Sequence, residues 1–370
     1  MKAKSKLPLI DRIVLWINYL LCFSLVLSYI APFVNPARFW PVAFFGLAYP
    51  PLLLSHLIIL VYWLFRNKKY MLLSIATILI GWPVLTNNVG FHISGSEKQE
   101  KPGGNSLRVM TYNVHDFKKY GSNNDIPTKH EILRIIEEQQ PDVITFQEFY
   151  SRNKGQYNMT DSLKRIMKTD QYYFEPFEAN SHEALGMAIF SRFPIIAHGM
   201  IRLSEMNSDD QCLFVDIKKN DKTIRIYNVH LQSVKFDEYD YRYLNSIKKQ
   251  DKPEIGSAKR LGSKLKIAFI KRAAQVATVK NHAGACTYPY VIAGDFNDTP
   301  ASYAVHQMGI GLKNSFKEKG FGLGRTYNGD FPNYQIDYIM ASLQFDVSSY
   351  QIIEKKLSDH YPVRSDLLLK

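Results

Sequence analysis

The first 96 residues constrain the fold of this chain most, because they contain almost no charge. Eight basic residues and one acidic residue occur there, and three stretches carry none: residues 13–31, 39–65 and 70–89. Each stretch is close to the ~20 apolar residues with which a helix crosses ~30 Å of hydrocarbon. We therefore predict three transmembrane helices. A cleavable signal peptide would explain only the first stretch, and a buried helical hairpin in a soluble core is the alternative.

The basic residues around these stretches predict an orientation in the membrane. Most of them precede the first stretch or separate the second from the third: Lys2, Lys4, Lys6, Arg12, Arg66, Lys68 and Lys69. Only Arg38 separates the first stretch from the second. Because basic residues concentrate in cytoplasmic loops, we expect the N-terminus in the cytoplasm and everything after about residue 90 outside it. The sequence predicts an integral protein of the inner or plasma membrane, with the bilayer as its partner and no indication of a protein partner.

The remaining sequence divides into a linker and a globular domain. Residues 94–105 are rich in Gly, Ser and Lys, as flexible linkers are, so we place a membrane segment at 1–93 and a domain at 106–370. The whole chain has a net charge of +12, of which the first 96 residues carry +7, leaving +5 for residues 97–370. So small an excess on the soluble part is weak evidence for nucleic-acid binding.

The soluble part shows short apolar strands with helices between them. We expect strands at 107–113, 142–148, 186–192, 225–231, 290–293 and 335–340, and a last strand after a turn at 358–362. Helices are expected at 129–140 and 259–282, and a loop insertion at 236–257. Strands outnumber helices, and the two kinds of element are interspersed. This order predicts an α+β or α/β sandwich of sheets flanked by helices.

The stretch Val291-Ile-Ala-Gly-Asp-Phe-Asn-Asp-Thr-Pro300 is the first candidate for a functional site. Alternation along an extended chain places Asp295 and Asn297 on one side, just beyond a buried strand. A carboxylate and a carboxamide held in this way can orient a water molecule and stabilise charge on a phosphoryl oxygen. A simple strand-to-turn transition explains the same residues equally well.

Five further polar clusters lie at or beside the ends of apolar strands: Asn113, Glu148, His230, Asp337 and the pair Asp359 and His360. Each of them alone has a structural explanation, such as a turn cap, a surface charge or a hydrogen-bonded core histidine. Their joint occurrence in this order favours functional groups carried at strand ends on a rigid scaffold.

With these pieces the chain resembles the endonuclease/exonuclease/phosphatase superfamily, which includes deoxyribonuclease I-like nucleases and neutral sphingomyelinases. The matching pieces are Met110-Thr-Tyr-Asn-Val-His115, Phe146-Gln-Glu148, Tyr227-Asn-Val-His-Leu-Gln232, Gly294-Asp-Phe-Asn-Asp-Thr-Pro300, Ile336-Asp-Tyr-Ile339 and Ser358-Asp-His-Tyr-Pro362. They extend over residues 107–370. The resemblance implies a four-layered αββα sandwich, with the site at one rim between the two sheets, and a metal-dependent phosphoesterase activity.

The resemblance also implies a metal site and a phosphate site. Glu148 would bind Mg²⁺, with Mn²⁺ as an alternative, since magnesium accepts one or two carboxylates and keeps several waters. Asn113 would help to hold the metal or the phosphate, and Asp359 would add a ligand directly or through water. Within a basic helical run, Arg272 is a candidate for phosphate contact, and a solvated helix face is the alternative.

The remaining residues receive catalytic roles from the same resemblance. His230 and Asn297 would donate to phosphoryl oxygens, and His360 would contact the phosphoryl group. Asp337 would bond the His360 ring and favour its charged form. Asp295 would orient or deprotonate the attacking water. Either Asp295 or His360 could be the general base, and the sequence leaves that choice open.

One position departs from the pattern of abasic-site endonucleases, which carry an aspartate two residues after the asparagine. His115 stands there, followed by Asp116. This departure weakens a repair-nuclease assignment and leaves the second metal ligand open. We expect a membrane-anchored, Mg²⁺-dependent phosphodiesterase or phosphatase acting on lipid head groups. A membrane-anchored extracytoplasmic nuclease and a non-catalytic membrane protein are the alternatives.

Overall fold

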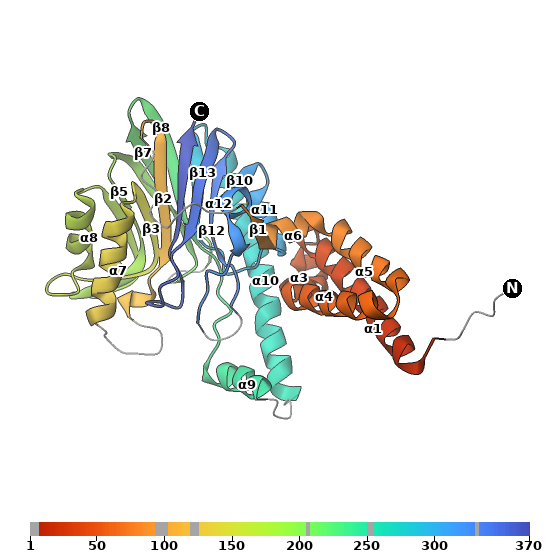
Figure 1. Ribbon diagram of the computed structural model, residues 1–370. Coiled ribbons are helices and arrows are strands. Elements are labelled where there is room, and N and C mark those ends of the chain that lie inside the picture. The colour runs from red at the N-terminus through yellow and green to blue at the C-terminus, as the bar shows by residue number, and fades with distance from the viewer. Residues whose placement is uncertain (1–6, 93–102, 119–125, 205–207, 250–254, 330–332) are drawn as a thin grey trace.

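The computed structural model describes residues 7–92, 103–118, 126–204, 208–249, 255–329 and 333–370. An N-terminal helix bundle lies against one side of a β-sandwich (Figure 1). The bundle is formed by α1 (Leu9–Ile30), η1 (Ala31–Phe33), α2 (Pro36–Phe39), α3 (Pro41–Leu47), α4 (Tyr49–Arg66), α5 (Lys68–Ile80) and α6 (Trp82–Asn88).

Prolines divide the apolar stretches more finely than the sequence suggested. Proline has no N–H to donate and is tolerated best in the first turn of a helix. Pro41 therefore starts α3 and Pro50 lies in the first turn of α4, so the stretch 39–65 is not one helix. The stretch 70–89 is bent by 68° between α5 and α6. Two helical segments, Leu9–Phe33 and Tyr49–Arg66, are long and apolar enough to span a membrane, or three if the bent pair counts as one.

Two six-stranded sheets form the sandwich. The first has the order β13 (Phe345–Ile352), β14 (Val363–Leu369), β2 (Ser106–Asn113), β3 (Val143–Arg152), β5 (Glu183–Ser191) and β4 (Tyr172–Ala179). The second has the order β10 (Leu312–Asn314), β12 (Asp337–Ser342), β9 (Tyr290–Asp295), β8 (Lys222–His230), β7 (Gln211–Lys219) and β6 (Ile195–Arg202). Each sheet mixes parallel and antiparallel pairs.

Helices cover the outer face of each sheet. The first sheet carries α7 (Ile126–Gln139) and α8 (Met159–Met167), and the second carries α10 (Ile255–Gly284) and α11 (Tyr303–Gly309). This arrangement confirms the predicted αββα sandwich. Five strands of the sandwich were not anticipated, namely β4, β6, β7, β10 and β13, and the expected loop at 236–257 contains the helix α9 (Glu238–Lys248). The remaining elements are η2 (His115–Phe117), α12 (Ser315–Lys319), β1 (Val89–Phe91) and β11 (Phe321–Leu323).

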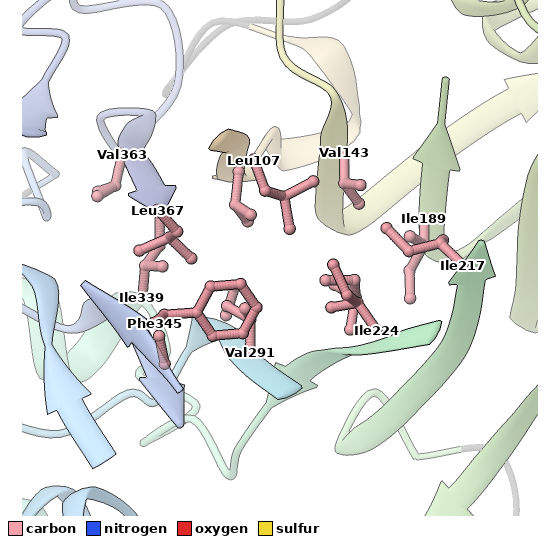
Figure 2. Packing of buried hydrophobic residues seen from close by; sticks show 14 of the residues in the cluster. Leu107, Val143, Ile189, Ile217, Ile224, Val291, Ile339, Phe345, Val363 and Leu367 are labelled. Atoms are coloured by element: carbon pink, nitrogen blue, oxygen red, sulfur yellow. The ribbon is translucent and has the colours of Figure 1, made fainter. Parts of the chain in front are cut away.

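The main core lies between the two sheets. Leu107 and Val143 from the first sheet face Val291 and Ile339 from the second, and all four are fully buried (Figure 2). Burying each such side chain contributes about 1.5–3 kcal/mol. The rim at which the strands end is therefore held by a core common to both sheets.

The bundle is packed on the sandwich and is not joined to it by a linker alone. β1, directly after α6, pairs antiparallel with β11. Ala301 of the sandwich shares a buried cluster with Leu25 and Tyr49 of the bundle. Gly46 permits this approach, because a Cβ there would lie 2.7 Å from the carbonyl oxygen of Ala301. Most of the predicted linker at 94–105 lies outside the described residues.

Candidate active site

The β-sheet register brings the predicted site residues to one rim of the sandwich. In the second sheet β8 and β9 run parallel and end at His230 and Asp295, which are cross-strand partners. On its other side Asp295 pairs with Asp337, the first residue of β12. In the first sheet β2 ends at Asn113, and its parallel pairing with β3 ends at Gln147, next to Glu148 inside β3. Side chains of both sheets thus converge at one edge of the core.

Unusual backbone conformations accompany this convergence. Glu148 has a φ of 52° and lies at a bulge where the register of β3 against β5 shifts. Bulges of this kind re-aim a side chain. Asn297 also has a φ of 52°. Gly294 has a φ of 144°, and any Cβ there would overlap the carbonyl oxygen of Val229. Strained positions that cluster in this way motivate a functional hypothesis for the rim.

Asp295 lies between two histidines. Its Oδ2 atom is 3.7 Å from His230 Nε2 and 3.6 Å from His360 Nε2, and the Asn113 amide nitrogen is 3.3 Å away. Burial raises the pKa of Asp295, and the neighbouring charge of Asp337 adds to that effect, whereas the histidines oppose it. The resulting pKa is about 6, so the carboxylate can take up a proton near neutral pH.

Each of these histidines is oriented by a second partner. His360 Nδ1 donates to Asp337 Oδ2 over 2.9 Å, and His230 Nδ1 donates to the carbonyl oxygen of Asp209 over 3.0 Å. Burial would lower the pKa of His360, but the charges of Asp337 and Asp295 outweigh it and raise that pKa well above its usual range. Both histidines therefore direct Nε2 towards Asp295, and His360 is held in its charged form.

A second cluster of polar side chains, around Glu148 and Asp359, lies beside Asp295 and its two histidines. The Asn113 amide nitrogen is 3.0 Å from Glu148 Oε1. His115 Nδ1 lies 3.4 Å from Glu148 Oε2 and 3.9 Å from Asp359 Oδ1. Burial would raise the pKa of Glu148, but the hydrogen bond from His115 and the charge of His230 lower it to about 2. Two converging carboxylates and an amide form a donor set suited to a hard divalent cation.

Another set of potential metal ligands comprises Asp295, Asp337 and His360, whose ligand atoms lie within 4.8 Å of one another. The geometry favours a hydrogen-bonded relay here over a metal site, because His360 Nδ1 is already bonded to Asp337. The carboxylates of Glu148 and Asp359 both lie within 3.9 Å of His115 Nδ1. They are the better candidates for the cation.

Arg272 lies next to the site but is fully buried, and its contacts are internal. Its Nε atom is 3.0 Å from Asp298 Oδ2, and Nη1 donates to the carbonyl oxygens of Gln232 and Asn297. These contacts are those of a residue that positions the loop after Asp295. The Asn297 side chain donates to the carbonyl oxygen of Leu231 over 2.9 Å. Arg272 thus joins α10 to the segments that follow β8 and β9, and Asn297 joins those two segments to each other.

Comparisons with known proteins identify the family. The model of the Endonuclease/Exonuclease/phosphatase family matches residues 110–360, about two thirds of the chain. The chain belongs to this family. It is accordingly a hydrolase of the phosphatase and nuclease type, acting on phosphoester bonds, and the alternative of a non-catalytic membrane protein does not hold. A model described as a domain of unknown function matches residues 11–88. No match was found among proteins with curated descriptions.

Solved structures of the family share the fold at low sequence identity. An endonuclease/exonuclease/phosphatase from Beutenbergia cavernae is 19% identical, with a TM-score of 0.51, covering 72% of each chain. The corresponding protein from Bacteroides vulgatus is 17% identical, with a TM-score of 0.51, covering 72% of this chain and 99% of its own. The human nocturnin catalytic domain has the same identity and TM-score, with 72% and 94% covered.

A buried polar network beneath the rim was not predicted from the sequence. Asn228 accepts a hydrogen bond from Gln147 Nε2 over 2.6 Å and donates to the carbonyl oxygens of Phe146 and Ala188. Gln147 also donates to Thr111. The network joins the two sheets directly below the site. The sequence signal for this network is the presence of Gln147 and Asn228 inside otherwise apolar strands, because buried polar groups require hydrogen-bond partners.

Proposed function

We propose that this family member is a membrane-anchored, Mg²⁺-dependent phosphoesterase that hydrolyses phosphoester bonds at a bilayer surface, with lipid head groups as substrate. The observation that carries the proposal is the position of Asp295 between His230 and His360, beside the carboxylate group of Glu148 and Asp359. The domain division 1–93, 94–105 and 106–370 is part of the proposal.

The protein's own residues would bind and polarise the phosphoryl group. His230 and His360 would donate from Nε2 to two of its oxygens, and Asn113 would donate from its amide nitrogen. Asp337 would keep His360 charged throughout the reaction. Asn297 and Arg272 are assigned positioning roles, because their side chains are bonded to backbone carbonyls and to Asp298. Neutralised phosphoryl oxygens make the phosphorus easier to attack.

Asp295 is the proposed general base. In its charged form it would accept the proton of a water molecule placed in line with the scissile bond. With a pKa of about 6 it is charged at neutral pH and still basic enough to accept that proton. His360 is the weaker candidate, because its ring is held protonated by Asp337 and Asp295. A protonated imidazole can donate but cannot accept.

Glu148, Asp359 and the amide oxygen of Asn113 would hold the divalent cation. When bound, Mg²⁺ or Mn²⁺ supplies positive charge to the phosphoryl and leaving-group oxygens. His115 lies between the two carboxylates, where abasic-site endonucleases carry an aspartate. A nitrogen donor at this position would favour Mn²⁺ relative to Mg²⁺.

The helix bundle supports a substrate at the membrane. Two of its segments are apolar enough to span a bilayer, and the bundle contacts the loop after Asn297 through Ala301. A site held beside the bilayer meets lipid substrates at high effective concentration. We propose that the N-terminus is cytoplasmic and the catalytic domain extracytoplasmic, as the basic flanks predict. Reporter enzymes fused after Lys370 test this, since a cytoplasmic signal would refute the orientation.

The substrate test compares the purified full chain on three substrates in mixed micelles: sphingomyelin-like lipids, inositol phospholipids and plasmid DNA. We expect Mg²⁺-dependent release of the phosphorylated head group, loss of turnover with EDTA, and loss with Asp295→Asn. His198→Asn, at an exposed position on β6, serves as the control. Plasmid cleavage without lipid turnover would replace the lipid substrate by nucleic acid. Activity that survives EDTA would contradict the metal-dependent mechanism.

A further inference from the structure

The helix α10 extends well beyond the sandwich that its C-terminal half covers. It has 30 residues, and its N-terminal half projects with α9 from the body of the domain (Figure 1). In the same view α10 runs across the ends of the bundle helices and not alongside them. If the bundle crosses a membrane, α10 lies along the surface of that membrane. We name α9 and the projecting N-terminal half of α10 the arm.

One face of α10 is continuous between its packed half and its projecting half. Lys266 and Phe269 contact the bundle, with the Lys266 ammonium 5.0 Å from the Trp40 ring and Phe269 edge-on to Phe44 at 5.4 Å. Steps of three and four residues keep one helix face and lead from Lys266 to Lys259 and Ile255 in the projecting half. Ile255 is 85% exposed and Lys259 is exposed. The face that touches the bundle therefore continues uncovered towards the tip of the arm.

The charges of the arm are distributed unevenly. Arg260 and Lys264 of α10 pair with Asp237 and Asp240, beside and within α9. Lys259 forms no ion pair among the residues that the structure describes. Residues 235–271 contain ten basic and five acidic residues, a net charge of +5, which equals the net charge of all residues 97–370. Acidic residues thus neutralise one side of α10, and the side continuous with the bundle contact keeps its positive charge.

A second uncovered surface lies beside α6. In the two-stranded sheet of β1 and β11, Phe91 pairs with Phe321 and Val89 with Leu323, so these side chains share one face. Phe91, Phe321 and Leu323 are more than half exposed. The Trp82 ring stacks on Phe91 at 5.7 Å. Aromatic and apolar groups next to the end of a membrane helix are typical of the membrane–water interface.

We propose that the Ile255–Lys259–Lys266 face of α10 and the apolar face of the β1–β11 sheet rest on an anionic lipid surface. Basic side chains beside exposed apolar ones are the pattern of helices that lie in the interface, and each basic residue near anionic lipid adds about 1 kcal/mol of attraction. This inference rests on the proposed anchoring by the bundle. Its consequence is that the rim carrying Asp295, tied to α10 through Arg272, is held at a fixed orientation to the bilayer.

The test places a nitroxide label on the arm of the full chain in vesicles. Cys22, Cys212 and Cys286, the free cysteines of the described residues, are first replaced by Ala. Labels are attached through Ile255→Cys and, as a matched control on another face of α10, through Lys271→Cys. Vesicles contain phosphatidylcholine alone or with phosphatidylglycerol. With phosphatidylglycerol we expect the label at 255 to become severalfold less accessible to a water-soluble nickel relaxant, with no change at 271. Combining Lys259→Glu and Lys266→Glu should remove the difference.

Equal accessibility of both labels in both vesicles would overturn the inference. If the chain floats with vesicles but the label at 255 stays in water, the arm proposal fails and the anchoring stands. If the chain does not float with vesicles at all, the anchoring itself fails. If the cysteine replacements disturb folding, hydrogen exchange makes the same comparison in the unmodified chain. It is measured on peptides from residues 255–266, with and without phosphatidylglycerol. Unchanged exchange would overturn the inference equally.

Discussion

The bundle and the sandwich arrange the same kinds of side chain in opposite ways. In the bundle the large apolar side chains face outward, with Leu20 65% and Phe65 81% exposed, while Asn18 and Ser74 meet in its interior over 3.0 Å. In the sandwich Leu107 and Ile339 are fully buried. Apolar burial drives folding only where water is the solvent. The bundle is consistent with a lipid environment, where packing and internal polar contacts hold helices together.

The contact between the two regions shows that they are built as one body. The bundle contributes β1 to a sheet with β11, and its helices α2 and α3 pack against α10. The loop that follows Asp295 and Asn297 touches the bundle through Ala301. The two regions thus expose different kinds of side chain and yet share an interface four residues from Asn297. Substitutions that disturb one region, the other, or the interface between them separate these properties.

The largest effect is expected in the sandwich with His360→Asn. Removing a charged donor from the phosphoryl group should lower kcat by roughly 10²–10⁴-fold and leave membrane insertion unchanged. Initial rates with Mg²⁺ and vesicle flotation measure the two properties in one preparation. His198→Asn is the control, and a wild-type rate for His360→Asn would remove this histidine from the mechanism.

A pair of identical substitutions tests the solvent of each region. Leu20→Asp places a charge on the outward face of α1 and should disfavour membrane insertion by about 3 kcal/mol. Leu343→Asp, at a residue 60% exposed between β12 and β13, should change the free energy of unfolding by no more than ~0.5 kcal/mol. An insertion assay for α1 measures the first effect. Urea unfolding of the detergent-solubilised chain measures the second. Equal tolerance of both substitutions would mean that the bundle faces water.

The interface is tested with Gly46→Val. A side chain there meets the carbonyl oxygen of Ala301 and the Cβ of Ala31, so the bundle and the loop must separate at a cost of about 1–3 kcal/mol. We expect a lower midpoint of thermal unfolding together with reduced kcat. Gly103→Val, where a Cβ meets nothing within 4 Å, is the matched control. An unfolding midpoint as high as that of the control would show that the two regions are independent.

The smallest effect concerns how the activity of the site in the sandwich depends on pH. Because Asp295 has a pKa of about 6 and acts in its charged form, kcat/KM should fall about tenfold for each pH unit below that value. The positive charge of His360 lowers the pKa of Asp295, so His360→Asn should move the acidic limb of its residual activity to higher pH. A limb that stays in place would assign the titration to another group.

The site was predictable to the extent that its residues lie at strand ends. His230 and Asp295 are the last residues of the parallel strands β8 and β9, which bring them to one edge. Glu148 reaches the same edge from inside β3, through the bulge that the sequence did not reveal. Arg272 shows where this reasoning stops, because a basic helical run does not reveal which member is buried against Asp298. The sequence identified His115 only as a departure from the pattern of abasic-site endonucleases. Its place between Glu148 and Asp359 depends on positive φ values at residues 115–117, which local sequence does not specify.

The sequence by itself determined the uncharged apolar segments of the bundle, the sandwich architecture and the identity of the groups at the rim, because hydrophobic period and run length indicate secondary structure and burial. Only the tertiary structure decided how α4, α5 and α6 divide the apolar stretches, how Asp295 is shared by two histidines, and that α10 lies across the bundle. These features depend on distances between residues remote in sequence. Such distances are set by packing and not by local preference.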